Sequence, residues 1–360
     1  MTLSGSASGS QTADGSGAYT FSNLLSGSYT LTPSGTGLAF TPANRSVTVT
    51  NANMAGVNFV ANTVVTYSIS GTITGGAGAT VTLSGAASAS TTANASGGYS
   101  FSGLLSGSYT VTPNLAGSTF SPVSTPVTIS TANISGINFA ANAPLVLDVQ
   151  TSKDQTPAST TIASPAFSTA TTNELLLAFV STDQISPTAV KVNSISGGGL
   201  TWTLVQRTNS QGGTAEIWRA FAAAKQTNIT VTATISQKVA SSMTIVGFEN
   251  VDATGANGVA AIGATASASA GSGAPTASLV TTRNGSWVFG VGNDFDRATL
   301  RTVGAAQTMV HQATSPTGDT YWVQRQTSQT PSSGTTVTIN DTAPTQDSWN
   351  LTICEILPQP

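Results

Sequence analysis

Two aromatic–arginine groups are the residues of this chain best suited to binding a ligand. They are Trp218-Arg219 and Tyr321-Trp322, the second with Arg325 close behind. An exposed aromatic ring can stack on a sugar ring, and a neighbouring guanidinium can donate hydrogen bonds to hydroxyl groups. The opposite interpretation is that these rings are core residues of strands. Because successive side chains of a strand point to opposite faces, we expect one of Tyr321 and Trp322 to lie outside the core.

Asp294 and Asp296 are candidate metal ligands. They stand at alternate positions in Asn293-Asp294-Phe295-Asp296, directly after an apolar run. Carboxylate oxygens at such spacing suit Ca²⁺, although the loop lacks the glycine and the distal glutamate of a calcium-binding hand. Aspartate side chains also cap turns through hydrogen bonds to the backbone. A calcium site and a capped turn therefore both stay open, and calcium is the one cofactor that the sequence suggests.

Residues for catalysis are scarce. The chain has one histidine, His311, and one cysteine, Cys354, which leave a single candidate base for a catalytic triad and too few ligands for a structural zinc site. A glycosidase would need two carboxylates at a defined separation, which the sequence does not provide. We therefore predict a protein without enzymatic activity, whose acidic side chains pair with Arg219 or Arg297. The candidate carboxylates are Glu216, Glu249, Asp294, Asp296 and Asp319.

The composition is depleted in charge. Charged residues make up 7% of the 360 residues, whereas soluble domains average about 25%, and 107 residues are serine or threonine. These values exclude a coiled coil, a helical bundle and a disulfide scaffold, and a net charge of −3 argues against a nucleic-acid partner. No segment approaches the roughly 18 apolar residues of a membrane span. Strands rich in Ser, Thr, Gly and Asn look like those of secreted or surface proteins of bacteria. Residues 1–30 show no signal peptide, so we expect the signal to lie upstream.

An internal repeat occupies the first 142 residues. Residues 2–62 align with residues 82–142 at a constant offset of 80, with 35 identities in 61 positions. Both copies alternate large apolar with small polar residues, the period of half-buried strands. We therefore expect two small antiparallel sandwiches: repeat 1 (residues 1–62) and repeat 2 (residues 63–142).

Repeat 1 lacks the first strand of repeat 2. Repeat 2 opens with Tyr67-Ser68-Ile69-Ser70-Gly71-Thr72-Ile73, whereas Met1 already aligns with Val81. One interpretation is a truncated sequence or a misplaced start codon. The other is that a neighbouring molecule supplies the strand, because an unpaired sheet edge invites strand addition. The second interpretation predicts head-to-tail self-association into filaments.

The pattern of repeat 2 resembles a known module. Gly97-Gly98-Tyr99-Ser100-Phe101 and Gly107-Ser108-Tyr109-Thr110-Val111 resemble the carboxypeptidase regulatory-like modules of bacterial surface proteins. That resemblance implies a prealbumin-like, Ig-like sandwich, similar to the B-type repeats of adhesins, and a stalk function. Some related repeats carry a Lys–Asn isopeptide crosslink, which residues 1–142 exclude because they contain no lysine.

Composition changes near residue 143. All five tryptophans and 13 of the 14 acidic residues lie beyond it, which predicts a third domain over residues 143–360, the head. About a dozen short strand-like runs indicate a large, jelly-roll-like β-sandwich. Phrases such as Leu200-Thr201-Trp202-Thr203-Leu204 resemble an uncharacterised module of secreted environmental bacterial proteins, which implies location and architecture only.

The expected function follows from these parts. We predict an all-β, non-enzymatic structural or adhesive protein, secreted or on the cell surface, in which stalk repeats carry a β-sandwich head. It would associate with itself through the open edge of repeat 1 and contact surface glycans, without entering a membrane. The alternative is a carbohydrate-binding accessory module of a secreted enzyme.

Overall fold

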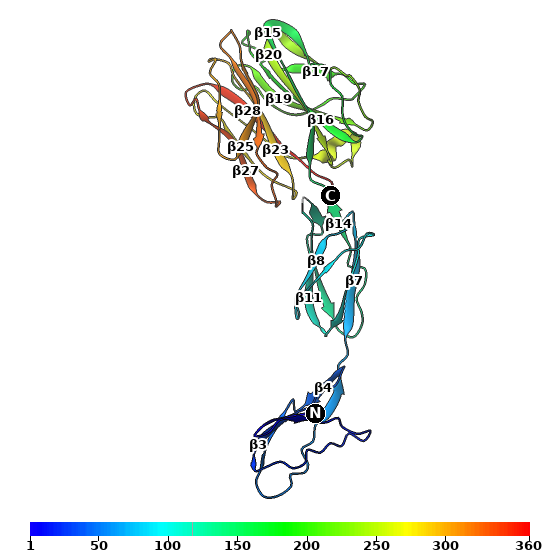
Figure 1. The fold of residues 1–360 in the computed structure, drawn as a ribbon. Coiled ribbons are helices and arrows are strands. Elements are labelled where there is room, and N and C mark those ends of the chain that lie inside the picture. Colours follow the sequence, from blue (N-terminus) through cyan, green and yellow to red (C-terminus); the bar gives the residue numbers. More distant parts are fainter. Residues whose placement is uncertain (117) are drawn as a thin grey trace.

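The computed structural model describes residues 1–116 and 118–360 and is nearly all β, which confirms the predicted all-β sandwich class. Repeat 1, repeat 2 and the head follow one another in an elongated row (Figure 1). Each contains apolar clusters of its own. In the repeats these clusters form because the large residues of the strands alternate with small polar ones and so share one face. No helix of the described residues is long and apolar enough to cross a membrane.

Repeat 2 is a closed sandwich of two four-stranded sheets. One has the order β10-β7-β14-β12 and the other β13-β11-β8-β9. Strand β7 lies inside the first sheet, antiparallel to β10 and parallel to β14. Fourteen apolar residues are buried between the sheets. The strands are β7 (Tyr67–Thr74), β8 (Thr80–Gly85), β9 (Ala89–Thr92), β10 (Gly98–Leu104), β11 (Gly107–Asn114), β12 (Thr119–Ser121), β13 (Thr125–Ile129) and β14 (Phe139–Asn142).

Repeat 1 keeps one of these sheets and loses most of the other. Its sheet β2-β1-β3-β5 matches β9-β8-β11-β13 at the offset of 80, and a separate β4-β6 pair matches β12 and β14. The segment that matches β10, residues 18–24, is not a strand. Only three apolar residues are buried. The strands are β1 (Thr2–Gly5), β2 (Gly9–Ser10), β3 (Gly27–Thr32), β4 (Leu38–Thr41), β5 (Arg45–Val49) and β6 (Val60–Thr63).

The head consists of two halves with the same strand order. In the first half the order is β15-β20-β16-β19-β18, with β17 on the far part of β20. In the second half it is β21-β28-β23-β26-β25, with an outer sheet β22-β27-β24. Strands β15 and β20 are 18 residues long, and each takes part in both the large sheet and the outer layer of the first half. In the second half two shorter strands take the place of each long one: β21 and β22 correspond to β15, and β27 and β28 correspond to β20. The connectivity is therefore simpler than that of a jelly roll, because each large sheet comes from one continuous half of the chain.

The bounds of the head strands are as follows. The first half contains β15 (Val146–Ala163), β16 (Glu174–Thr182), β17 (Val192–Ser196), β18 (Thr203–Thr208), β19 (Thr214–Ala222) and β20 (Thr232–Glu249). A 3₁₀ segment, η1 (Ala256–Ala261), leads to β21 (Ile262–Ala270), β22 (Thr276–Val280), β23 (Trp287–Asp294), β24 (Thr302–Val303), β25 (Gln307–Thr314), β26 (Thr320–Gln326), β27 (Thr336–Ala343) and β28 (Trp349–Ile356).

Three apolar clusters hold the head together. The middle cluster joins the two large sheets, with Phe179 stacked on Phe289 at 6.0 Å between ring centroids. A second cluster lies on the outer face of the first sheet and contains Trp218, and a third contains Trp322 on the outer face of the second. Both large sheets are therefore covered by apolar layers on both faces, so their inner strands are buried throughout, as β16 and β28 are.

The difference between the repeats predicts different stability. We expect backbone amides of β1 and β3 to exchange with solvent at least about tenfold faster than those of β8 and β11, because few apolar contacts protect them. Hydrogen-exchange mass spectrometry of the full chain measures both repeats together, with the amides of β16 as the protected reference. Equal protection of the two repeats would contradict the incomplete core of repeat 1.

Candidate functional site

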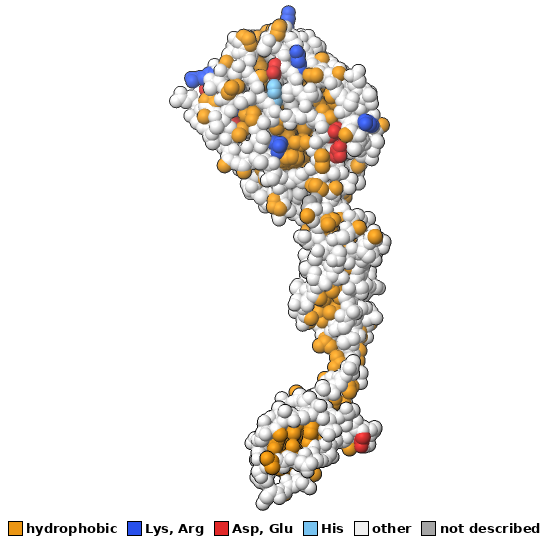
Figure 2. Space-filling view, viewed as in Figure 1, with side chains coloured by type: hydrophobic (Ala, Val, Ile, Leu, Met, Phe, Trp, Pro, Cys, Tyr) orange, Lys and Arg blue, Asp and Glu red, His pale blue; other side chains and the backbone are white. Residues whose placement is uncertain are grey.

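An open groove lined by apolar and uncharged polar residues runs along repeat 1. It has a volume of about 720 Å³, and apolar side chains gather in a hollow on this face of the molecule (Figure 2). Leu3 and Leu31 form its floor, and Tyr19, Phe21 and Leu24 belong to the unpaired segment beside it. None of its lining residues is charged. Apolar side chains that are left half-exposed beside this groove are buried at the matching positions of repeat 2, so the groove is the candidate functional site.

Repeat 2 shows what fills the matching space. Ile69 and Ile73 of β7 are 0% and 1% exposed, inside the core. The backbone of β7 pairs with Gly98, Tyr99, Ser100 and Phe101 of β10 on one side and with Phe139 and Ala140 of β14 on the other. One strand therefore supplies core side chains and completes the hydrogen bonding of two neighbours.

Gly71 fixes the fit of β7 at its centre. A Cβ atom here would lie 1.8 Å from the carbonyl oxygen of Ile137, and glycine alone avoids this contact. The same carbonyl accepts a hydrogen bond of 2.6 Å from the Tyr99 hydroxyl. In repeat 1 the hydroxyl of Tyr19 donates in the same way to the carbonyl of Val57, so the wall of the groove is already arranged as in repeat 2.

The aromatic and leucine side chains beside the groove match buried residues of repeat 2 but are themselves partly exposed. Tyr99, Phe101 and Leu104 are buried in repeat 2, whereas their counterparts Tyr19, Phe21 and Leu24 are only half-buried. Burial raises the pKa of Tyr99 to about 12 and also raises the pKa of Tyr19. Residues 18–24 contain the same strand-forming residues as β10 but have no strand to pair with. An arriving strand would therefore meet an apolar floor and unpaired backbone groups.

The aromatic residues predicted to bind sugars are buried. Trp218, Tyr321 and Trp322 are 8%, 2% and 1% exposed. Trp218 and Trp322 belong to the outer clusters of the two halves, and the Tyr321 hydroxyl donates to Asp319 Oδ2 at 3.1 Å. The expectation that one of Tyr321 and Trp322 lies outside the core is wrong, because β26 has apolar layers on both faces. None of the three rings offers a face to a ligand.

The two predicted arginines support loops and a neighbouring ring. Arg219 Nη1 donates to the carbonyl of Asn257 at 3.1 Å. Arg325 lies over the Trp287 ring, 4.5 Å from its centroid, and donates to the carbonyl of Gln326. Burial lowers the pKa of both guanidinium groups. The five candidate ligand-binding residues thus do not converge on one surface.

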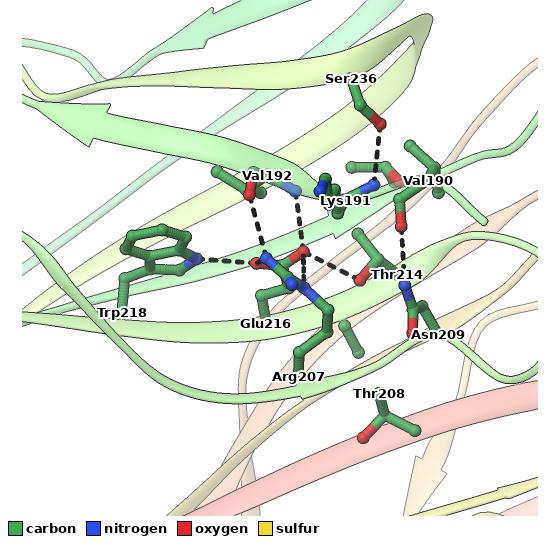
Figure 3. Close-up of polar contacts among 12 residues, drawn as sticks. Val190, Lys191, Val192, Arg207, Thr208, Asn209, Thr214, Glu216, Trp218 and Ser236 are labelled. Atoms are coloured by element: carbon green, nitrogen blue, oxygen red, sulfur yellow. Dashed lines mark hydrogen bonds and ion pairs between the residues drawn. The ribbon is translucent and has the colours of Figure 1, made fainter. Parts of the chain in front are cut away.

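Glu216 is saturated with donors (Figure 3). Its two oxygens accept hydrogen bonds from Arg207 Nε at 2.7 Å, Arg207 Nη2 at 3.0 Å and Trp218 Nε1 at 2.8 Å. The backbone N–H of Val192 and the hydroxyl of Thr214 complete the set. Its ionic partner is therefore Arg207 and not Arg219, since β18 and β19 place Arg207 opposite Glu216. A carboxylate held by five donors is suited to joining β17, β18 and β19 rather than to transferring protons.

Asp294 and Asp296 lie together with a third aspartate, Asp347, which is more than 50 residues away along the chain and so gives no local sequence signal. One oxygen from each of Asp294, Asp296 and Asp347 lies within 4.8 Å of the others. Asp294 caps its turn by accepting from the backbone of Asp296 at 3.0 Å, which is one of the two alternatives left open. Arg301 pairs with Asp294 and Asp347, and Arg297 with Asp347, so two cations already oppose the three carboxylates. Burial nevertheless raises the pKa of Asp294 to about 8.

The remaining candidates have structural surroundings. His311 Nε2 lies 3.0 Å from Asp154 Oδ1, between the two halves of the head. Cys354 is buried in the middle cluster, and burial raises the pKa of its thiol. Glu249 lies at the end of β20, far along the chain from Glu216, and belongs to a different acidic group. Glu216 and Glu249 are therefore not shown as a pair, whereas Asp294 and Asp296 lie together in the group that Arg297 and Arg301 oppose.

Replacement of Glu216 tests its structural function. We expect Glu216→Gln to lower the free energy of unfolding of the head by about 2–3 kcal/mol, because Arg207 would lose its buried ionic partner. Tryptophan fluorescence during denaturant unfolding reports on the head alone, since all five tryptophans lie there. Lys225→Gln, an exposed change, is the control and should shift stability by less than about 0.5 kcal/mol. A similarly small shift for Glu216→Gln would refute the assignment.

No protein-family model matches the sequence, and no curated protein is detectably similar to it.

Proposed function

We propose that this protein is a non-enzymatic structural or adhesive protein of the cell exterior, in which repeat 1 accepts an extended strand from a neighbouring molecule. The observation that carries the proposal is the pair of repeats. In repeat 2 the matching space is filled by β7, and in repeat 1 the same walls surround an open groove. The identity of 35 residues in 61 makes repeat 2 a direct template for the filled state of repeat 1.

The template defines the chemistry of the incoming strand. It would carry β-branched residues spaced like Ile69 and Ile73 and a glycine between them, as β7 does. It would be uncharged, because the groove has no charged lining residue to pair with a charged side chain. Main-chain pairing with residues 18–24 and β6 would supply affinity, and the spaced side chains would supply specificity.

The architecture supports a stalk. Repeat 2 separates the head from repeat 1, which carries the open groove (Figure 1), and residues 1–142 carry only two charged side chains, Asp14 and Arg45. Surfaces with so little charge can pack side by side in an array without strong mutual repulsion. A surface rich in Ser and Thr stays hydrated through its hydroxyl groups. These features favour a protein that works in an extended assembly.

No observation favours the carbohydrate-binding alternative. It depended on exposed aromatic rings at Trp218, Tyr321 and Trp322, and all three are buried. The head is therefore proposed as the presented end of the stalk and not as a sugar-binding module.

A synthetic strand tests the groove. A blocked peptide of residues 66–75, which contains β7, should bind the full chain with a stoichiometry of one, since repeat 2 already holds its own β7. The same peptide with Gly71→Val should bind at least about tenfold more weakly, because its side chain would meet the carbonyl of Val57. Isothermal titration calorimetry measures both.

Two results would overturn the proposed groove. Absence of binding by the β7 peptide at millimolar concentration is one. Equal affinity of the Gly71→Val peptide is the other, because it would show binding without the predicted fit.

A pair of adjacent leucines tests self-association. Leu24 lines the groove, whereas Leu25 is 81% exposed and lies outside it. If a second copy is the neighbour, sedimentation velocity should show oligomers that Leu24→Asp dissociates at least about tenfold more readily and that Leu25→Asp leaves intact. A chain that remains monomeric while it binds the β7 peptide would assign the strand to a different protein and contradict head-to-tail self-association.

A further inference from the structure

A second acidic group lies where the head begins. Asp148, Glu174 and Glu249 each place one carboxylate oxygen within 4.8 Å of the other two. They come from the start of β15, the start of β16 and the end of β20, which are neighbouring strands of one sheet. Asp148 follows the junction with repeat 2 by only a few residues, and Asn250, next to Glu249, donates to the carbonyl of Pro144 at 2.9 Å.

The strand register brings these like charges together. Leu175 pairs with Phe248, so Glu174 and Glu249 follow as cross-strand neighbours at the end of the ladder. Glu249 is itself paired with Val146, and Asp148 lies in the irregularity between Leu147 and Gln150. Like charges directly opposite each other destabilise a sheet unless something compensates them.

Glu174 has an unused oxygen inside the group. Glu174 is 0% exposed. Its Oε1 accepts two hydrogen bonds from Thr171, one from the backbone N–H at 2.6 Å and one from the hydroxyl at 2.9 Å. Oε2 is also buried but has no hydrogen-bond partner. A buried polar atom without a partner is costly, so this oxygen points to a ligand.

No cation of the chain compensates the three charges. None of the ion pairs among residues 1–116 and 118–360 includes Asp148, Glu174 or Glu249. The group around Asp294 differs, because Arg297 and Arg301 oppose its charges. Burial, with a contribution from Asp148, raises the pKa of Glu174 to about 7, as expected of a carboxyl group without a counter-charge.

We propose that Asp148, Glu174 and Glu249 bind a divalent cation, with Ca²⁺ as the ion that fits best. Calcium takes oxygen ligands at about 2.3–2.6 Å, so two oxygens on one ion lie at most about 5 Å apart, and the separations here satisfy this limit. A divalent ion would reduce the local charge from −3 to −1 and give Glu174 Oε2 a partner. Mg²⁺ demands shorter distances and a stricter octahedron.

The site would strengthen the base of the head. One ion would link β15, which leads in from repeat 2, to β16 and β20 in the middle of the sheet. The loop before β16 already folds over the group, with the N–H of Ala170 donating to Asp148 Oδ2 at 2.8 Å. The bound ion would therefore join the entry strand of the head to its core.

Calcium titration of the full chain tests this site. At a Ca²⁺ concentration of about 100 times its Kd, the tryptophan-monitored melting temperature of the head should rise by about 5–10 °C relative to chelator. Glu174→Gln should abolish this rise and, in chelator, melt at or above the wild-type temperature, because it removes a repulsive charge. Glu249→Gln, at a half-buried position, should weaken calcium binding at least about tenfold in calorimetry.

The control is Asp296→Asn in the arginine-neutralised group, which should keep the full calcium response. A wild-type chain with neither a calcium-dependent melting shift nor calorimetric binding would overturn the proposal. An unchanged response in Glu174→Gln would overturn it as well, and loss of the response in Asp296→Asn would place the ion at the other group. An equal response to Mg²⁺ would contradict the choice of calcium.

Discussion

Strand β7 is the element on which the sandwich of repeat 2 depends. It pairs with β10 and β14 at once and buries Ile69 and Ile73 between the two sheets. Strand pairing and core formation are therefore coupled in a single segment. In repeat 1, residues 18–24 have no such strand beside them and do not form the strand that their sequence favours. Local sequence is insufficient there because a strand needs a partner for its backbone groups.

The head depends on a different constraint, the burial of both faces of its large sheets. Two halves of equal strand order pack through the cluster around Phe179 and Phe289, and each half covers its outer face with further strands. This arrangement leaves little solvent-facing strand surface, so polar residues that lie in the sheets must be paired inside. The buried carboxylate of Glu216 accepts hydrogen bonds from five donors. The buried carboxylate of Glu174, in contrast, has one oxygen without a hydrogen-bond partner.

The fold class and the repeat could be predicted because both leave local signals. Alternating residues predict strands, and a constant offset of 80 exposes the duplication. Whether Tyr321 and Trp322 are both core residues stayed open at the level of sequence, since alternation does not tell whether a sheet has one covered face or two. The two acidic groups could not be predicted either, because the order of the strands in the sheets, and not proximity along the chain, brings Asp347 and Glu249 to the other members. The twofold strand order of the head was likewise hidden, since its halves share topology rather than a run of identical residues.

The most direct test of the central claim is an experimental structure of the full chain bound to the β7 peptide. The account predicts that the peptide lies in the repeat 1 groove, antiparallel to residues 18–24 and parallel to Phe59 and Val60, as β7 lies in repeat 2. Its two isoleucines should point to Leu3 and Leu31, and residues 18–24 should become a strand. A peptide bound along another sheet edge, with the groove still open and residues 18–24 still irregular, would contradict the account.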